Sequence, residues 1–170
     1  MTTLAKARRH WKVPALDELL RYRNAEVIAR FAKDYGVEPR TARLVFDDLL
    51  RFLWLSVWAQ EKARPATEIA MFEAMSIVDE MWHVFLTFSR DYEAFSIRFF
   101  GSYLHHNPAK LLRRAPAASV AESRRKSDAT VELAWRQLGP RIARRWFHEY
   151  AVKYPMPTIR RLQLQAAKAR

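Results

Sequence analysis

The chain has 170 residues, of which 50% are hydrophobic and 13% aromatic, and it carries a net charge of +12. This composition is too rich in core-forming side chains for a disordered polypeptide, and the length is that of one domain. The absence of cysteine excludes disulfides, zinc–thiolate sites and thiol nucleophiles, and it fits a reducing compartment. No apolar stretch reaches membrane-spanning length, and no signal-peptide core follows the basic residues at the start, so we expect a cytoplasmic protein.

Helical spacing of apolar residues dominates the chain. Only three glycines occur, and no Asn-Gly or Asp-Gly turn signals a hairpin. The sequence therefore predicts an all-α fold, a single-domain bundle of about six or seven helices with a basic C-terminal extension. We expect residues 1–13 to form a basic N-terminal arm and residues 14–108 to form the helical core.

The core is expected to begin with two helices. The first covers residues 14–34 and is capped by Gly36. Pro39 opens the second, which is nearly all apolar and should lie at the centre of the bundle. Its narrow polar stripe, expected to face solvent, consists of Arg43, Asp47, Asp48 and Arg51.

Two further helices complete the expected core. The third covers residues 67–88, after a polar break that contains Pro65. The fourth covers residues 90–103 and ends near Gly101, and Pro108 prevents its continuation.

The rest of the chain is basic. Residues 109–127 are expected to form a weakly ordered, alanine-rich connector. Residues 128–155 should form two C-terminal helices that pack on the core and are separated at Gly139-Pro140. Residues 156–170 can form a basic tail helix, whose few apolar anchors make it a candidate for folding on a partner.

One polar cluster stands out in the expected core. Asp79, Glu80 and His83 lie on the third helix, and His105 and His106 follow the fourth. Residues three or four apart share a helix face, so Asp79 and His83 form the preferred inward pair, and only one carboxylate is expected to face His83. If the paired histidines fold back over this helix, the four side chains of Asp79, His83, His105 and His106 form a nitrogen–oxygen site for zinc or iron.

A structural explanation competes with the metal site. Asp79 would fix the tautomer of His83 through a hydrogen bond, while the paired histidines satisfy carbonyls at a helix end. A di-iron centre is disfavoured, because the chain supplies only one Glu-x-x-His motif. In a hydrolytic or oxidative version of the site, Glu80 or Tyr92 would handle protons. No nucleophile motif, phosphate loop or cofactor fingerprint accompanies the cluster, so the sequence names no reaction.

The same segment resembles a known family. Residues 78–92, the Phe99-Phe100-Gly101 run and the Leu104-His105-His106-Asn107-Pro108 run are similar to the bacterial glycine-rich-domain-containing-protein-like family. The resemblance implies a small helical domain with an Asp-x-x-x-His signature, a terminal His-His pair and no assigned activity. Similar sequences carry Cys at the position of Ser96, and plant relatives carry His at that of Phe85, so this chain lacks two ligands that the resemblance would supply.

Charge is distributed unevenly along the chain. Residues 1–107 hold 15 Lys and Arg against 14 Asp and Glu, whereas residues 108–170 hold 15 against 4. The C-terminal third therefore predicts a polyanion partner, and an acidic protein is favoured over nucleic acid because no nucleic-acid module is recognisable. Its candidate binding residues are Arg136, Arg141, Arg144, Arg145, Lys153, Arg160 and Arg161. The interleaved aromatic residues are expected to point into the core.

Overall fold

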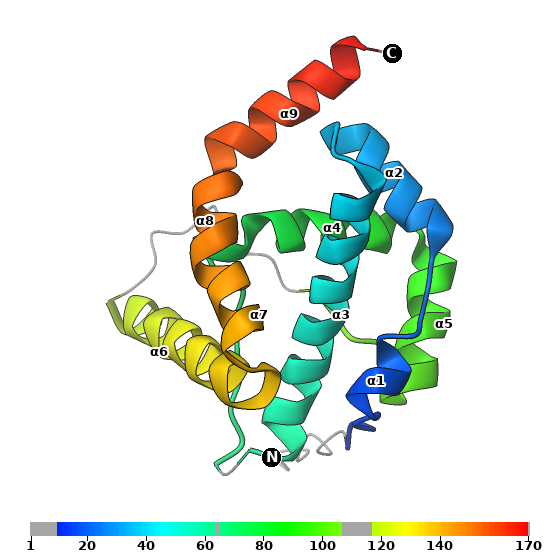
Figure 1. Ribbon diagram of the computed structural model, residues 1–170. Helices are drawn as coiled ribbons and strands as arrows, with labels where there is room; N and C mark the ends of the chain where they lie inside the picture. Colours follow the sequence, from blue (N-terminus) through cyan, green and yellow to red (C-terminus); the bar gives the residue numbers. More distant parts are fainter. Residues whose placement is uncertain (1–9, 64, 107–116, 170) are drawn as a thin grey trace, which may run out of the picture.

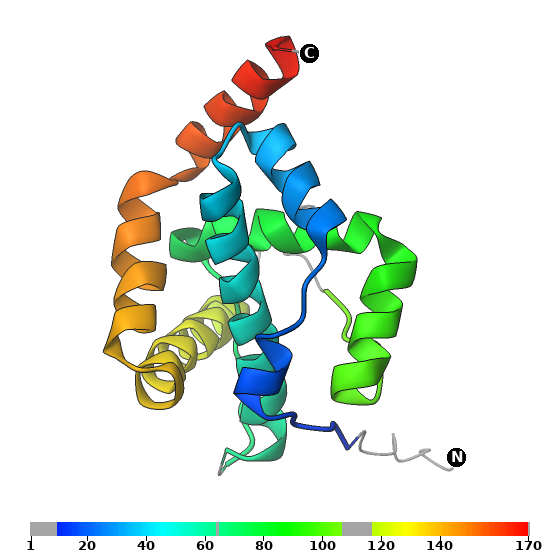
Figure 2. The same ribbon diagram turned by 45° about the vertical axis from the view of Figure 1, so that its right-hand side comes forward.

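The computed structural model describes residues 10–63, 65–106 and 117–169, and Figures 1 and 2 show it from two sides. These ranges are mostly helical and contain no strand, which confirms the predicted all-α class. No helix in the described ranges is long and apolar enough to cross a membrane.

The helices follow one another along the chain, with the longer connections after α3 and after α5. In chain order they are α1 (Leu16–Leu19), α2 (Ala25–Tyr35), α3 (Pro39–Glu61), η1 (Glu73–Met75), α4 (Ser76–Thr87), α5 (Ser89–Phe100), α6 (Ala117–Leu133), η2 (Ala134–Leu138), α7 (Pro140–Arg144), η3 (Arg145–Glu149), α8 (Tyr150–Lys153) and α9 (Met156–Lys168). Helix α3 begins at Pro39 as predicted and lies at the centre, with α7 and α8 on one side and α1 and α5 on the other (Figure 1). Helix α4 packs across α3 and carries the polar cluster.

The predicted first helix is interrupted between α1 and α2. Asn24 has an extended backbone, and its side-chain oxygen accepts a hydrogen bond from the Val27 amide at 3.0 Å, so it starts a new helix. The interruption lets the ring of Tyr22 enter the core, where its centroid lies 4.8 Å from that of Phe95. Packing of this ring therefore overrides the helical periodicity of the segment.

The predicted third helix starts later than expected. Residues 66–72 are not helical, and Thr130 of α6 holds this stretch by accepting a hydrogen bond from the Ala70 amide at 3.1 Å. The rings of Phe72 and Phe147 stack on each other, with centroids 5.4 Å apart. Tertiary contacts with the C-terminal half thus keep residues 66–72 extended, and α4 begins only at Ser76.

The C-terminal half contains more helix than the sequence predicts. Residues 109–116 of the expected connector lie outside the described residues, whereas residues 117–127 are part of helix α6 and do not form an irregular connector. Alanine, arginine, lysine and glutamate favour helix, and Lys126 forms ion pairs with Glu122 at 3.0 Å and with Glu68 at 2.7 Å. Local propensity and one tertiary ion pair therefore replace the apolar anchors that the segment lacks.

The tail forms the predicted helix, and that helix is anchored. Gly139 adopts a φ of 85° before Pro140 opens α7, so the chain turns sharply and then runs through α7, η3 and α8 to a break at Tyr154-Pro155. Helix α9 then packs against α2, as both views show (Figures 1 and 2), and Ile159 is fully buried.

The polar stripe of α3 is not wholly exposed, which corrects the prediction. Asp48 is completely buried and accepts hydrogen bonds from Arg51 at 3.0 Å, from Arg145 Nε at 2.6 Å and from the Tyr150 hydroxyl at 2.7 Å. Burial disfavours the charged guanidinium, but the hydrogen bonds and charge of Asp48 outweigh it and raise the pKa of Arg145. This buried Asp48 cluster (Asp48, Arg51, Arg145 and Tyr150) ties the C-terminal half to the central helix.

Candidate metal site

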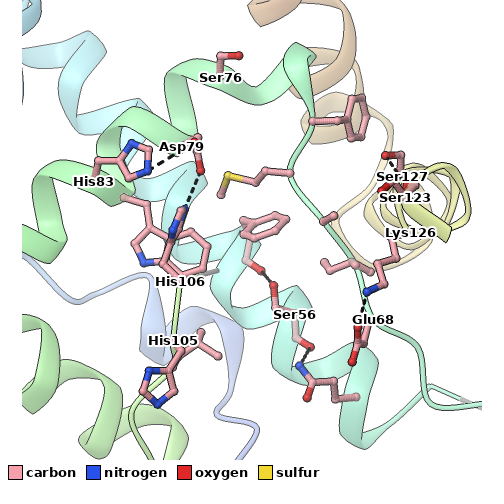
Figure 3. A pocket seen from close by; sticks show the side chains of 18 of the residues that line it. Ser56, Glu68, Ser76, Asp79, His83, His105, His106, Ser123, Lys126 and Ser127 are labelled. Atoms are coloured by element: carbon pink, nitrogen blue, oxygen red, sulfur yellow. Dashed lines mark hydrogen bonds and ion pairs between the residues drawn. The ribbon is translucent and has the colours of Figure 1, made fainter. Parts of the chain in front are cut away.

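Three side chains from two segments meet beside α4. Asp79 and His83 lie one turn apart on this helix, and His106 comes from the segment that follows α5. His106 Nε2 lies 3.0 Å from Asp79 Oδ1, and His83 Nε2 lies 3.8 Å from Asp79 Oδ2 (Figure 3). One ligand atom from each of the three residues lies within 4.8 Å of the others, so Asp79, His83 and His106 form what we call the His–Asp cluster.

Buried hydrogen bonds hold the segment that carries His106 against α4. Gly101 ends α5 in the left-handed conformation with a φ of 75°, at the position where the sequence predicts the stop. Beyond it the Tyr92 hydroxyl donates to the carbonyl of Leu104 at 2.6 Å and accepts from Trp82 Nε1 at 3.0 Å. The ring of His106 then meets the face of Trp82 edge-on, with centroids 4.4 Å apart. The folding back of this segment, on which the predicted site depends, is therefore present.

His83 lies differently from the prediction. It is not an inward residue, because 44% of its side chain is exposed, and Asp79 is 34% exposed. Both carboxylates face it, since His83 Nδ1 lies 3.8 Å from Glu80 Oε2 while Nε2 faces Asp79. The imidazole presents its two nitrogens in different directions, so it can lie between carboxylates that diverge on the helix.

His105 is not part of the cluster. Its side chain is exposed and lies away from Asp79 (Figure 3), with its ring 4.8 Å from that of Tyr103. Successive residues of a non-helical segment point in different directions, so only one member of the predicted histidine pair can reach α4. Of the two histidines predicted as metal ligands in this segment, only His106 lies close enough to Asp79 and His83 to bind the same ion.

The two predicted proton-handling residues have structural partners. Tyr92 is fully buried, and burial raises its pKa to about 12, so it is unsuited to proton exchange near neutral pH. Glu80 accepts a hydrogen bond from the hydroxyl of Tyr35 on α2. No local pattern in the sequence points to Tyr35, because only the packing of α2 against α4 brings it to Glu80.

The cluster opens into a broad cleft of about 860 Å³. Its walls are formed by α3, α4, residues 68–73, residues 104–106 and α6. Ser123, Lys126 and Ser127 of α6 lie on the side opposite the cluster, with Lys126 turned toward Glu68 (Figure 3). The cleft gives ions and small molecules access to the exposed edge of His83.

Geometry permits a metal ion among the three side chains. Zinc bonds of about 2.0–2.2 Å to nitrogen and oxygen place tetrahedral ligands roughly 3.4 Å apart. His106 Nε2 lies 3.0 Å from Asp79 Oδ1, His83 Nε2 lies 3.8 Å from Asp79 Oδ2, and one atom from each residue lies within 4.8 Å of the others, so the side chains need to close in on a bound ion. Two histidines and one carboxylate with free positions are a set that zinc and ferrous iron accept. In the part of the chain that the structure describes, no fourth His, Asp or Glu joins the group.

The predicted anion-binding residues fall into two groups. Arg145 is part of the buried Asp48 cluster, with 12% of its side chain exposed, so the prediction that it binds a partner is wrong. The others have exposed side chains and are Arg136, Arg141, Arg144, Lys153, Arg160 and Arg161. The interleaved aromatics Trp146, Tyr150 and Tyr154 are buried as predicted, whereas Trp135 is 57% exposed.

Comparison with known proteins gives a family but no activity. No curated protein and no solved structure matches the chain. The family model described as UCP032817-like matches residues 17–138, a range that contains the whole His–Asp cluster and more than half of the chain. The chain belongs to the UCP032817-like family.

Proposed function

We propose that the protein is a cytoplasmic metal-binding protein in which Asp79, His83 and His106 hold one zinc or ferrous ion. The observation that carries this proposal is the convergence of ligand atoms from positions 27 residues apart, within 4.8 Å and at the edge of an open cleft. The cysteine-free composition fits the reducing cytoplasm.

The bonding of Asp79 supports a ligand role over a purely structural one. A carboxylate has about four acceptor sites, and among the residues that the structure describes Asp79 has one partner at hydrogen-bonding distance, His106. Its contact to His83 is 3.8 Å, too long for the hydrogen bond that would fix the tautomer of this histidine. A cation between the three groups would use free lone pairs of Asp79 and His83, and it would replace the proton through which His106 Nε2 bonds to Asp79 Oδ1.

The arrangement of the ligands leaves the metal accessible. Three protein ligands complete neither a tetrahedral nor an octahedral shell, and the remaining positions would face the cleft. A bound metal would supply Lewis acidity there, while the chain's own residues hold it and Lys126 and the serines of α6 provide polar contacts for a small ligand.

Metal analysis of protein purified without a histidine tag tests the proposal. After reconstitution with zinc or, anaerobically, with ferrous iron, we expect about one equivalent bound, and we expect Asp79→Ala and His106→Ala to lose it. His105→Ala is the matched control, because it removes the neighbouring imidazole that lies outside the cluster. Less than about a tenth of an equivalent of any transition metal in the wild type, or equal losses in His105→Ala and His106→Ala, would refute the site.

A second proposed function is docking of an acidic protein on the basic C-terminal surface. The specific observation is that apolar side chains are exposed on the helices that carry four of the six exposed cations: Trp135 in η2, Val152 in α8 and Leu164 in α9 are 57%, 73% and 64% exposed. Side chains of this kind suit a protein partner with apolar and acidic groups better than a phosphate backbone.

Binding of a glutamate-rich amphipathic peptide and of a DNA oligonucleotide, compared at several salt concentrations, tests this second proposal. The peptide should bind at low salt, and a double variant, Arg160→Glu with Arg161→Glu, should abolish the binding. Charge reversal of Arg21 and Arg30, which are exposed on the N-terminal half, is the control and should leave it unchanged. If the oligonucleotide binds more tightly than the peptide, the partner is a nucleic acid and the proposal of an acidic protein is wrong.

The likeness to the glycine-rich-domain-like family remains a proposal of common descent. Its support is the Asp79-x-x-x-His83 spacing together with the return of His106 to the same helix.

A further inference from the structure

The side of His83 that faces away from Asp79 is occupied by a second carboxylate. Glu80 Oε2 lies 3.8 Å from His83 Nδ1, and the Glu80 side chain is only 20% exposed. The same oxygen accepts the hydrogen bond of the Tyr35 hydroxyl. Glu80 is therefore fixed by α2 at the nitrogen of His83 that the His–Asp cluster does not use.

Tyr35 is itself held rigidly. It is 4% exposed, and its ring stacks on Phe31 with centroids 4.4 Å apart, so the phenol cannot swing away. Gln163 of α9 also forms a hydrogen bond with the Tyr35 side chain. Burial, followed by the contact with Glu80, raises the pKa of Tyr35, so its hydroxyl keeps the proton that it donates.

We propose that Tyr35 and Glu80 are the positioning residues of the metal site, which orient His83 so that Nε2 and not Nδ1 binds the ion. This inference rests on the proposed metal-binding function. Histidines that bind metals commonly donate their other ring N–H to a carboxylate, which fixes the tautomer and raises the basicity of the ligand nitrogen. Glu80 lies on the side of His83 where such an acceptor is needed. At 3.8 Å it forms no hydrogen bond with Nδ1 in the metal-free geometry, just as Asp79 forms none with Nε2, and we expect metal binding at Nε2 to bring Nδ1 and Glu80 together.

Titration of untagged protein with zinc measures the effect of this pair. Glu80→Ala should raise the zinc Kd roughly tenfold to a hundredfold, the range found for loss of outer-shell partners, and Tyr35→Phe should raise it by about threefold to tenfold. The visible absorption of the cobalt(II)-substituted protein should change in both variants, because the orientation of a ligand imidazole changes. Since Tyr35 acts through Glu80, adding Tyr35→Phe to Glu80→Ala should raise the Kd no further.

Tyr150→Phe is the matched control. It removes another buried hydroxyl that donates to a carboxylate, Asp48, outside the residues that line the cleft. It should lower the free energy of unfolding and leave the zinc Kd and the cobalt spectrum unchanged.

The outcomes separate the inference from the function on which it rests. If the wild type binds one zinc and Asp79→Ala does not, but Tyr35→Phe and Glu80→Ala bind zinc as the wild type does, the positioning role is wrong and the metal site stands. If the wild type binds no zinc, cobalt or iron, both are wrong.

Discussion

The molecule contains two carboxylate clusters of opposite design. Asp48 is wholly buried and receives hydrogen bonds from two arginines and a tyrosine. Asp79 is 34% exposed, has one partner at hydrogen-bonding distance, and faces a cleft. Within the described residues the first carboxylate is fully hydrogen-bonded, whereas the second has further acceptor sites. We therefore expect the Asp48 cluster to contribute to stability, and ligand binding at the His–Asp cluster is our proposal.

The largest expected effect comes from breaking the closed cluster. Arg145→Ala would leave Asp48 buried without its bidentate partner, so we expect it to lower the free energy of unfolding by about 3–5 kcal/mol in urea denaturation. Arg144→Ala is the control, because this neighbour is 72% exposed and its change should stay within about 0.5 kcal/mol. Similar losses in the two variants would show that the buried cluster does not hold the two halves together.

A smaller effect on the free energy of unfolding is expected at Tyr92, whose hydrogen bonds contribute both to stability and to the position of His106. Tyr92→Phe removes the donor to the Leu104 carbonyl and the acceptor of Trp82 Nε1, which should cost about 1–3 kcal/mol. Because these bonds return His106 to α4, zinc affinity should fall as well. Chemical denaturation and zinc titration of the same preparation check both effects, and wild-type zinc affinity in this variant would contradict our account of how the site is assembled.

Alkaline pH should weaken the fold by a similar or smaller amount. Burial raises the pKa of Tyr92 from 10.0 to about 12, so above pH 10 the unfolded chain loses a proton that the folded chain keeps. Stability is complete below about pH 10 and is lost as the pH rises toward 12, with roughly 1 kcal/mol lost near pH 11 from this residue. Circular dichroism and tyrosinate absorbance should change together, and ionisation of all tyrosines before unfolding would contradict the prediction.

The smallest effect on stability is expected at the open cluster. Asp79→Asn should change the free energy of unfolding by less than about 1 kcal/mol, because a part-exposed carboxylate contributes little. The same substitution at Asp48 should cost several times more, because it leaves two buried guanidinium groups without a carboxylate. Thermal denaturation of both variants without metal makes the comparison. Equal destabilisation would mean that the His–Asp cluster is structural.

Local signals were sufficient for much of the fold. Pro39 correctly predicts the start of α3, and Gly101 correctly predicts the end of α5. Both residues determine the backbone conformation within a single turn, so their effect can be read from the local sequence. The Asp79–His83 spacing likewise identified two members of the His–Asp cluster, since residues four apart share a helix face.

Long-range packing explains the rest. Asp48 was placed on the solvent face of α3 because its partner Arg145 lies 97 residues away in the sequence. The choice of His106 over His105 depends on the Tyr92–Leu104 hydrogen bond, and the contact of Tyr35 with Glu80 depends on how α2 crosses α4. None of these contacts has a local pattern in the sequence.

Anomalous diffraction at the zinc edge, from crystals of the reconstituted protein, tests the metal site most directly. We predict a single strong peak within about 2.0–2.2 Å of His83 Nε2, His106 Nε2 and an oxygen of Asp79. Crystals without an anomalous peak at these atoms, or with zinc held only by His105 or by residues elsewhere, would contradict the account.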